Sequence, residues 1–225
     1  MTVTATYPRL SHDWLKHETD VALSREVVTI KAAAGKIDTG MVLGKITVGA
    51  ASSAAKSGGN TGNGALTLDA TTPVLTGAKA GVYAVRAVGV AANGASFSVT
   101  DPDGFVIGNY TIGGPAFATG VKFSIADGAT DFVLGDGFDI TVAAGSGKYV
   151  ACDLAAVDGS QVPAALLKDY TDASGVADVK AVAIVGFAEV VMAELSWHAS
   201  INLIAEKRSV MATLAAKHIK NRAVA

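Results

Sequence analysis

Asp158-Gly159-Ser160-Gln161-Val162-Pro163-Ala164-Ala165-Leu166-Leu167 lies in the middle of residues 145–197 and sets the pattern for much of the chain. Asp-Gly is typical of tight turns, because glycine adopts the positive φ that such turns need. An apolar run follows directly, and a second one, Ala181–Val185, leads into Ala188-Glu189-Val190. This alternation of turn and buried strand predicts a β architecture and contains no catalytic motif.

The composition indicates a β-rich protein with many turns. Half of the 225 residues are hydrophobic, 17% are charged and 25 are glycine. That length allows one large core or two small ones. The formal net charge of −2 gives no general attraction to nucleic acid or to an anionic membrane. No apolar run is long enough for a membrane span, and the first residues lack the pattern of a secretory signal, so we expect synthesis in a cytoplasm.

Two blocks of the sequence resemble the head decoration proteins of lambda-like tailed phages. The resemblance rests on turn and strand signatures in the family's order: Ser24–Ile30 and Val42–Thr47, then Gly145–Tyr149, Asp153, Asp158–Gln161, Asp172–Gly175, Ala188–Val190 and Leu195–Trp197. About ninety residues separate the two blocks, and this separation looks like an inserted domain. The resemblance implies a mainly β fold. We expect a lambda-type decoration-protein β-domain, β-tulip-like, interrupted by an inserted small β-sandwich or barrel.

The domain boundaries follow from composition. Residues 49–64 are mainly Ala, Ser, Gly and Asn, which is typical of a linker, and we expect a boundary within them. We predict that residues 58–144 form the inserted all-β domain, because short apolar strands alternate there with turns such as Asp101-Pro102-Asp103-Gly104. The decoration domain is then discontinuous, residues 24–57 plus 145–225. It ends in an amphipathic helix whose expected apolar face includes Ile201, Leu203, Ile204 and Val210. The charged residues beyond Glu206 are all basic, and towards the C-terminus of a helix they are expected to interact with the helix dipole.

Residues 1–23 show no sustained periodicity and predict an arm with a single apolar anchor at Trp14-Leu15. Such an arm can become ordered on a partner. The alternative is that Trp14 packs on its own domain.

A search for chemistry gives no active site. Gly145-Ser146-Gly147-Lys148 looks like part of a phosphate-binding loop, but Tyr149 stands where Ser or Thr is needed. Four acidic residues could gather around a cation, yet their spacing matches no EF-hand loop and favours turns; they are Asp127, Asp131, Asp136 and Asp139.

Other catalytic or metal-binding groups are equally unsupported. His12, His17, His198 and His218 lack metal-ligand spacing, and Ser160 is not in a nucleophile elbow. Cys152 is the sole cysteine, which excludes an intramolecular disulfide. We therefore predict a non-enzyme without cofactor or metal.

The resemblance implies a virion structural protein. It would bind the major capsid protein on the outside of the expanded head as a homotrimer and stabilise the shell. We expect shell contacts at Trp14, Leu15, Arg25, Glu26 and Val27, where a strand edge could pair with the capsid protein. The expected trimer contacts are Glu189, Val190, Glu194 and Trp197.

Two other functions remain open from the sequence. The inserted domain could bind a host-surface glycan, for which Tyr110 and Phe117 are the candidate loop aromatics, whereas Phe105 is expected in the core. The whole chain could instead be a carbohydrate-binding adhesion protein or another virion β-protein such as a tail-tube component.

Overall fold

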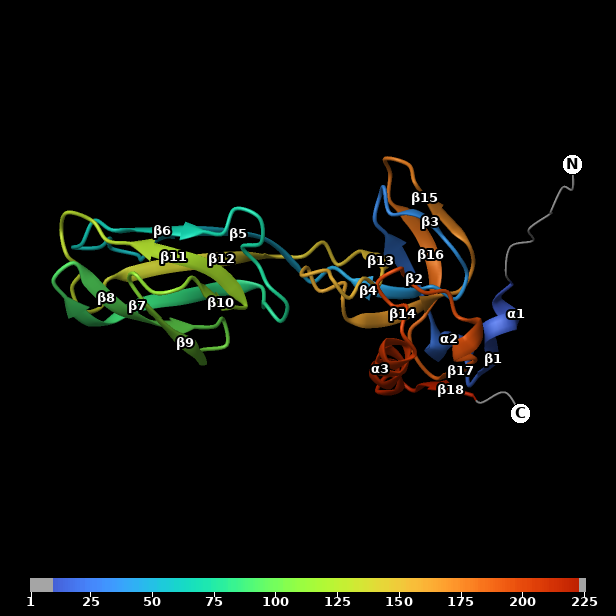
Figure 1. The fold of residues 1–225 in the computed structure, drawn as a ribbon. Coiled ribbons are helices and arrows are strands. Elements are labelled where there is room, and N and C mark those ends of the chain that lie inside the picture. Colours follow the sequence, from blue (N-terminus) through green and yellow to red (C-terminus); the bar gives the residue numbers. More distant parts are fainter. Residues whose placement is uncertain (1–9, 223–225) are drawn as a thin grey trace, which may run out of the picture. The chain divides into compact units, whose positions relative to one another are not determined.

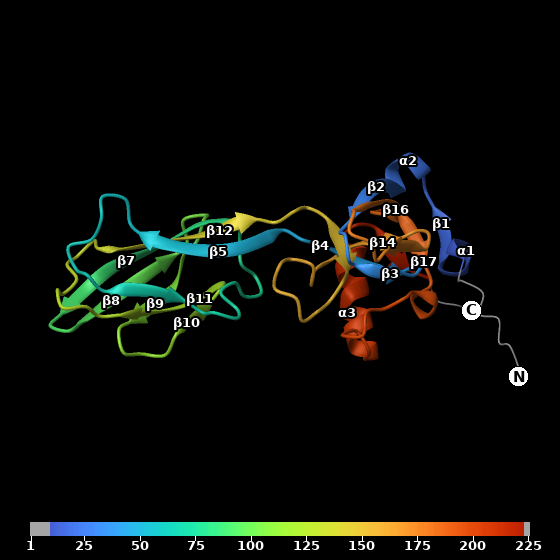
Figure 2. The ribbon, with the colours of Figure 1, turned by 90° about the horizontal axis from the view of Figure 1, so that it is seen from above.

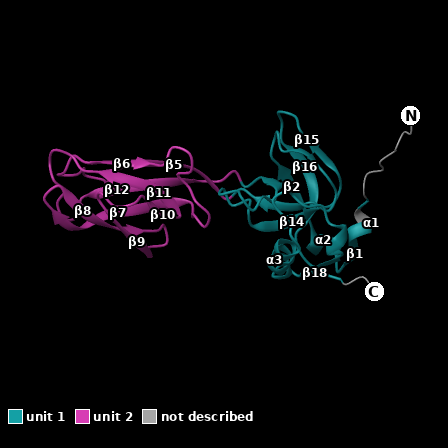
Figure 3. Ribbon diagram, viewed as in Figure 1, with its two compact units in different colours: residues 1–46, 147–225 teal, residues 47–146 magenta. Residues whose placement is uncertain are grey.

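The computed structural model describes residues 10–222, which form a mainly β protein. The chain divides into two compact units, residues 1–46 with 147–225 (unit 1) and residues 47–146 (unit 2) (Figure 3). Unit 2 is one continuous segment, and unit 1 is formed by the segments on either side of it. Each unit has its own hydrophobic core.

Unit 1 contains a closed barrel with the strand order β13-β2-β16-β14-β4. Ile30, Leu43 and Leu167 are fully buried within its core. The alternation expected from Arg25 onward therefore places one side of that strand inside the barrel. The barrel strands are β2 (Arg25–Ile30), β4 (Val42–Lys45), β13 (Tyr149–Ala151), β14 (Pro163–Leu167) and β16 (Val179–Ile184).

The Asp158–Leu167 segment adopts the turn and buried strand that its sequence predicts. Gly159 has a φ of +98°, and Ala165–Leu167 are completely buried. The loop before β14 crosses directly over β4, because a Cβ atom on Gly44 would lie only 1.8 Å from the carbonyl oxygen of Ser160. Closure of the barrel at this point thus requires glycine at position 44.

Smaller elements surround the barrel (Figure 1). One sheet has the order β1-β17-β18, and β15 pairs with β3. The strands are β1 (Leu15–Glu18), β3 (Gly35–Ile37), β15 (Thr171–Ala173), β17 (Ala188–Val190) and β18 (Ile219–Asn221). The helical elements are α1 (Ser11–Trp14), α2 (Val21–Ser24), the 3-10 turn η1 (Met192–Glu194) and α3 (Ile204–Ala215).

The C-terminal region differs from the prediction. Helix α3 buries Val210 in the core, but Leu203 and Ile204 at its start are exposed. Its last turn contains no basic residue: Lys207 and Arg208 lie in its first half, and Lys217, Lys220 and Arg222 lie beyond its end, where the chain continues as β18, parallel to β17. The interpretation of these charges as partners of the helix dipole was therefore wrong.

Unit 2 is formed by two sheets that share one core. The large sheet has the order β5-β12-β7-β8-β9, and the small sheet has the order β10-β11-β6. The strands are β5 (Val48–Ala55), β6 (Ala65–Leu68), β7 (Gly81–Ala91), β8 (Gly94–Thr100), β9 (Val106–Thr111), β10 (Phe117–Thr119), β11 (Val121–Ala126) and β12 (Gly137–Ala144). Figure 2 shows β5 running beside β12.

The first seven of the sixteen residues predicted as a linker form a strand. Val48–Ala55 forms β5, which pairs antiparallel with β12, and the units divide at residues 46 and 47. Small uncharged residues suit a flexible linker, but they equally suit an edge strand, because the pairing is made by the backbone. Composition alone could not separate these two cases.

The aromatic residues of unit 2 also differ from the prediction. Tyr110 and Phe117, expected in loops, are buried in the core on β9 and β10. Phe105, expected in the core, is 67% exposed, and the ammonium group of Lys79 lies 5.9 Å from the centre of its ring.

Candidate partner-binding surface

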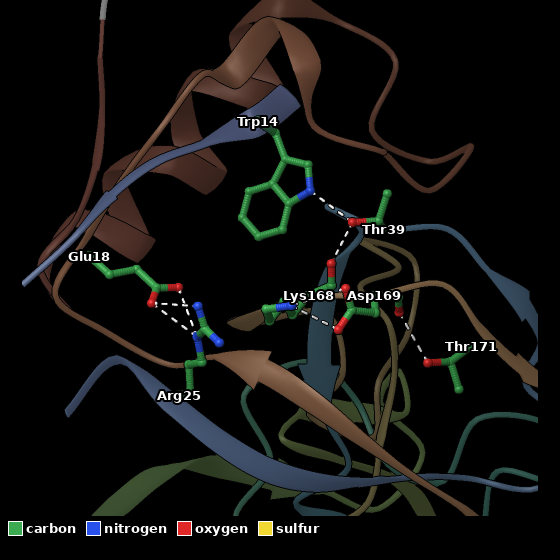
Figure 4. Close-up of polar contacts among 7 residues, drawn as sticks. All are labelled: Trp14, Glu18, Arg25, Thr39, Lys168, Asp169 and Thr171. Atoms are coloured by element: carbon green, nitrogen blue, oxygen red, sulfur yellow. Dashed lines mark hydrogen bonds and ion pairs between the residues drawn. The ribbon is translucent and has the colours of Figure 1, made fainter. Parts of the chain in front are cut away.

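Trp14 attaches the N-terminal segment to unit 1 (Figure 4). Its indole ring is fully buried, and Nε1 donates a 2.9 Å hydrogen bond to Oγ1 of Thr39. The same hydroxyl donates a 2.5 Å bond to the carbonyl oxygen of Lys168. Gly40 has a φ of +72°, and a Cβ there would lie 2.9 Å from the indole. The indole therefore packs directly against the backbone of Gly40.

This burial corrects the expected role of Trp14 as a shell contact. An indole with no exposed surface and a satisfied N–H cannot reach a partner unless the segment detaches. Of the predicted arm, residues 1–9 lie outside the described residues. Residues 10–23 are tied to the domain by α1, β1 and α2. The alternative, that Trp14 packs on its own domain, is the one that the structure supports.

Strand β1 brings two groups of candidate residues together. Leu15 lies opposite Val190 across the β1–β17 pair, so a predicted shell contact and a predicted trimer contact are neighbours. Val190 is completely buried and packs in the core with Trp14. Its side chain therefore cannot form a subunit contact, which corrects that prediction. At the other end of β1, both Nε and Nη2 of Arg25 lie about 3 Å from the carboxylate of Glu18, as Figure 4 shows.

Helix α2 and the start of β2 expose an apolar group. Val21, Leu23 and Val27 are each more than half exposed, with Val27 at 64%. Asp20 begins α2 by accepting a 2.7 Å hydrogen bond from the backbone N–H of Ala22. This helix was not predicted from the sequence, although Asp before an apolar residue is an N-cap signal.

One edge of β2 is largely unpaired within the described residues. All of β2 pairs with β16, but its contact with β13 is limited to Ile30 opposite Tyr149. Val27 lies opposite Val182, whose carbonyl accepts a hydrogen bond from Lys168 on the far side of β16. The backbone N–H and C=O of Val182 therefore point away from β2. In an antiparallel pair, the backbone groups of two opposite residues either both point towards each other or both point away. The N–H and C=O of Val27 thus point to the unpaired edge.

The other predicted trimer residues lie at the surface. Trp197 is half-buried, and the ammonium group of Lys207 lies 5.6 Å from its ring. Lys207 follows Leu203 by one helical turn, so the two lie on the same side of the start of α3, where Leu203 and Ile204 are exposed. Glu194 is exposed.

A second surface feature lies on the β1-β17-β18 sheet. The rings of Phe187 and His218 stack with centroids 4.8 Å apart, and both backbones are left-handed, with φ of 52° and 61°. They line a hollow of about 270 Å³ together with His17, Glu189 and Lys220. The Glu189 carboxylate lies 3.8 Å from Arg222.

The polar residues that suggested chemistry have structural partners. Nζ of Lys148 lies 2.6 Å from the carboxylate of Asp178, and the pKa of that carboxyl is lowered mainly by this contact. Asp136 accepts hydrogen bonds from the backbone N–H groups of Thr61, Gly62 and Val133. Burial alone would raise the pKa of Asp136, but these three bonds outweigh it and lower the pKa.

The described residues contain no group of three or more His, Cys, Asp or Glu side chains placed to hold a metal ion. Burial raises the pKa of Cys152 to about 12, so its thiol is protonated at neutral pH. Among the same residues, no helix has the length and apolar character required to cross a bilayer.

A family model of the bacteriophage lambda head decoration protein D matches residues 4–219. The chain belongs to this family. The match runs through both units, further than the half of the chain on which the sequence resemblance rested. Decoration proteins of this family are structural and non-enzymatic, bind the major capsid protein and lie on the outside of the phage capsid. The chain is therefore a capsid decoration protein.

Other comparisons add little. No curated protein matches the chain. Two crystal structures of Xanthomonas campestris FlgL, in space groups H3 and C2, match with 22% and 24% sequence identity and TM-scores of 0.31 and 0.30. The matches cover 47% and 48% of this chain and 33% of each FlgL chain. TM-scores this low carry no argument about fold or function.

Proposed function

We propose that this decoration protein binds the expanded head as a homotrimer and braces the shell. Family membership carries the proposal. A protein that binds only the expanded lattice stabilises it by mass action at every site, so modest contacts repeated over the shell add up to a large effect. We further propose that unit 1 is the β-tulip-like decoration domain and that unit 2 is a structural outer module.

We place the shell contact at the unpaired edge of β2 and the adjoining apolar group of α2. The outward N–H and C=O of Val27 can pair with an extended strand of the major capsid protein. Exposed Val21, Leu23 and Val27 offer apolar area beside that edge. Arg25 and Glu26 lie on β2 itself and Leu15 lies on β1; all three remain part of the proposed contact. Trp14 supports it from inside the core.

The proposed trimer contact lies around Trp197, Leu203 and Ile204, with the exposed Glu194 and the surface residue Glu189 as further candidates. An exposed apolar group of this kind is typical of a subunit interface. We do not propose glycan binding, because Tyr110 and Phe117, on which that prediction rested, are buried.

A pair of proline variants tests the shell contact. Val27→Pro removes an outward N–H without removing a bond to β16, and Val176→Pro is the control at a residue that is fully exposed in the loop before β16. We expect Val27→Pro to weaken binding to expanded heads at least about tenfold, which corresponds to about 1.4 kcal/mol. Val176→Pro should bind like the wild type. Equal affinity of the two variants, with both folded by circular dichroism, would refute the β2 contact.

The trimer contact is tested separately by sedimentation equilibrium. Leu203→Lys should shift the protein from trimer towards monomer, and Val162→Lys, at another exposed apolar residue of unit 1, should not. A wild-type protein that remains monomeric both free and on the shell contradicts the trimer.

A further inference from the structure

The edges of the two sheets of unit 2 are not equally protected. Exposed strand edges invite pairing with another chain, and proteins usually limit this with short strands, charges, prolines, bulges or covering segments. Strands β6 and β10 have only four and three residues. The pairing of β9 contains a register shift, and Phe117 of β10 packs so closely on β9 that a Cβ on Gly108 would lie 2.9 Å from its ring.

Over residues 51–55, strand β5 is not protected by short length, charge, proline or a bulge. It has eight residues without a charge or a proline, and within the described residues it is paired with β12 alone. Its register shift lies before Ala51, so residues 51–55 pair regularly with β12. Ser52, Ser53, Ala54 and Ala55 are all exposed, which means that both faces of this part of the strand are open.

The hydrogen-bond direction shows which backbone groups face outward. The N–H of Lys56 donates to the carbonyl of Gly137 on β12, so the backbone N–H and C=O of residue 56 point towards β12. Directions alternate along a strand, and therefore residues 54 and 52 also face β12. The N–H and C=O groups of Ala51, Ser53 and Ala55 consequently point away from β12, at the unpaired edge.

We propose that β5 is a self-association site at which two copies of this chain pair antiparallel through a two-fold axis at Ser53. In this register Ser53 lies opposite Ser53 of the second copy, and Ala51 lies opposite Ala55, so all outward backbone groups between residues 51 and 55 obtain partners. Identical edges fit each other in this way because antiparallel pairing is symmetric, and the contact closes with two copies.

The side chains of β5 favour a second copy as the partner. Opposing residues are Ala with Ala and Ser with Ala or Ser, so the pairing places no like charges together and buries no ion. If the proposed trimer is correct, the two-fold contact cannot join subunits within one trimer. It then links neighbouring trimers through unit 2, which adds a connection above the shell to the contacts that each copy makes with the capsid protein.

Disulfide trapping with free full-length protein tests the proposal without a capsid. Ser53→Cys places two thiols opposite each other, and opposing Cα atoms about 5.5 Å apart are within the range for a disulfide. Ser52→Cys tests the register, because residue 52 lies opposite Ala54 in the second copy. Val88→Cys is the control, an exposed residue on the central strand β7. Native Cys152 is buried and does not compete.

With copper-phenanthroline as oxidant, Ser53→Cys should form a dimer at least about tenfold faster than Val88→Cys, because pairing raises the effective concentration of the thiols. Equal rates for Ser53→Cys and Val88→Cys overturn the proposal, and a faster reaction of Ser52→Cys overturns the two-fold at Ser53. Ser53→Lys should also reduce self-association in sedimentation velocity, whereas Val88→Lys should not. If Ser53→Lys leaves self-association unchanged but weakens head binding, the partner of β5 is another protein and the proposal fails.

Discussion

Removal of the Trp14 side chain should destabilise unit 1 and release the N-terminal segment. The indole is fully buried and packs against Gly40. Replacement of a buried Trp by Ala typically costs about 3–5 kcal/mol, because apolar contacts are lost and a cavity remains. Small domains are stable by only about 5–15 kcal/mol, so Trp14→Ala should leave unit 1 marginal.

The hydrogen bond to Thr39 can be separated from the packing. Trp14→Phe retains most of the ring but removes the Nε1 donor, whereas Thr39→Val removes the acceptor. A net hydrogen bond is worth about 1 kcal/mol, so a double-mutant cycle over these two substitutions should give a coupling energy of about that size.

Urea unfolding followed by tryptophan fluorescence measures these effects in unit 1. The chain has two tryptophans, Trp14 and Trp197, and both lie in unit 1, so unit 2 does not contribute. Trp197 remains as the probe in the Trp14 variants, and Trp197→Phe is the reference for the contribution of Trp14. A loss below about 1 kcal/mol for Trp14→Ala would be typical of a surface substitution and would refute the anchoring role of Trp14.

Three further predictions concern closure of the barrel, acid stability and thiol reactivity. Gly44→Ala should prevent folding of unit 1, because its Cβ would lie 1.8 Å from the carbonyl of Ser160, whereas Gly175→Ala, with no atom within 4 Å, should fold normally by circular dichroism. The lowered pKa of Asp136 means that its carboxylate stabilises unit 2 above the unfolded value near 3.9 and that this stability is lost as the pH falls towards the folded pKa. Asp136→Asn should therefore destabilise unit 2 by about 1–3 kcal/mol at pH 7, and by less at pH 3, in thermal unfolding. An equal loss at both pH values would contradict a stabilising role of the ionised Asp136 carboxylate. Cys152 should react with a thiol reagent only as fast as unit 1 unfolds, and rapid labelling of the native protein would contradict its burial.

The sequence predicted those parts of the fold in which side-chain pattern and backbone geometry agree. Gly159 and the apolar run after it gave a turn and a buried strand, because positive φ and burial are both visible in residue types. The same holds for the alternation in β7, where Tyr83 and Val85 point into the core. Residues 49–55 were misjudged because β5 is held by backbone pairing, for which Ala and Ser leave no pattern.

The candidate surface was harder to predict, since burial depends on contacts between distant segments. Trp14 and Val190 are exposed or buried according to whether β1 pairs with β17, which no local pattern specifies. The unpaired edge of β2 likewise depends on how little of β13 reaches it. The start of α2 could have been predicted from the sequence, because Asp20 is an N-cap residue.

The proposed function as a whole is tested most directly by the number of copies bound to heads of its own phage before and after expansion. Purified protein is mixed with empty heads of each kind, sedimented and quantified at saturation. We predict binding to expanded heads alone, saturating at three copies for each local three-fold position. Absence of binding to expanded heads, or equal binding to both forms, would contradict the proposal.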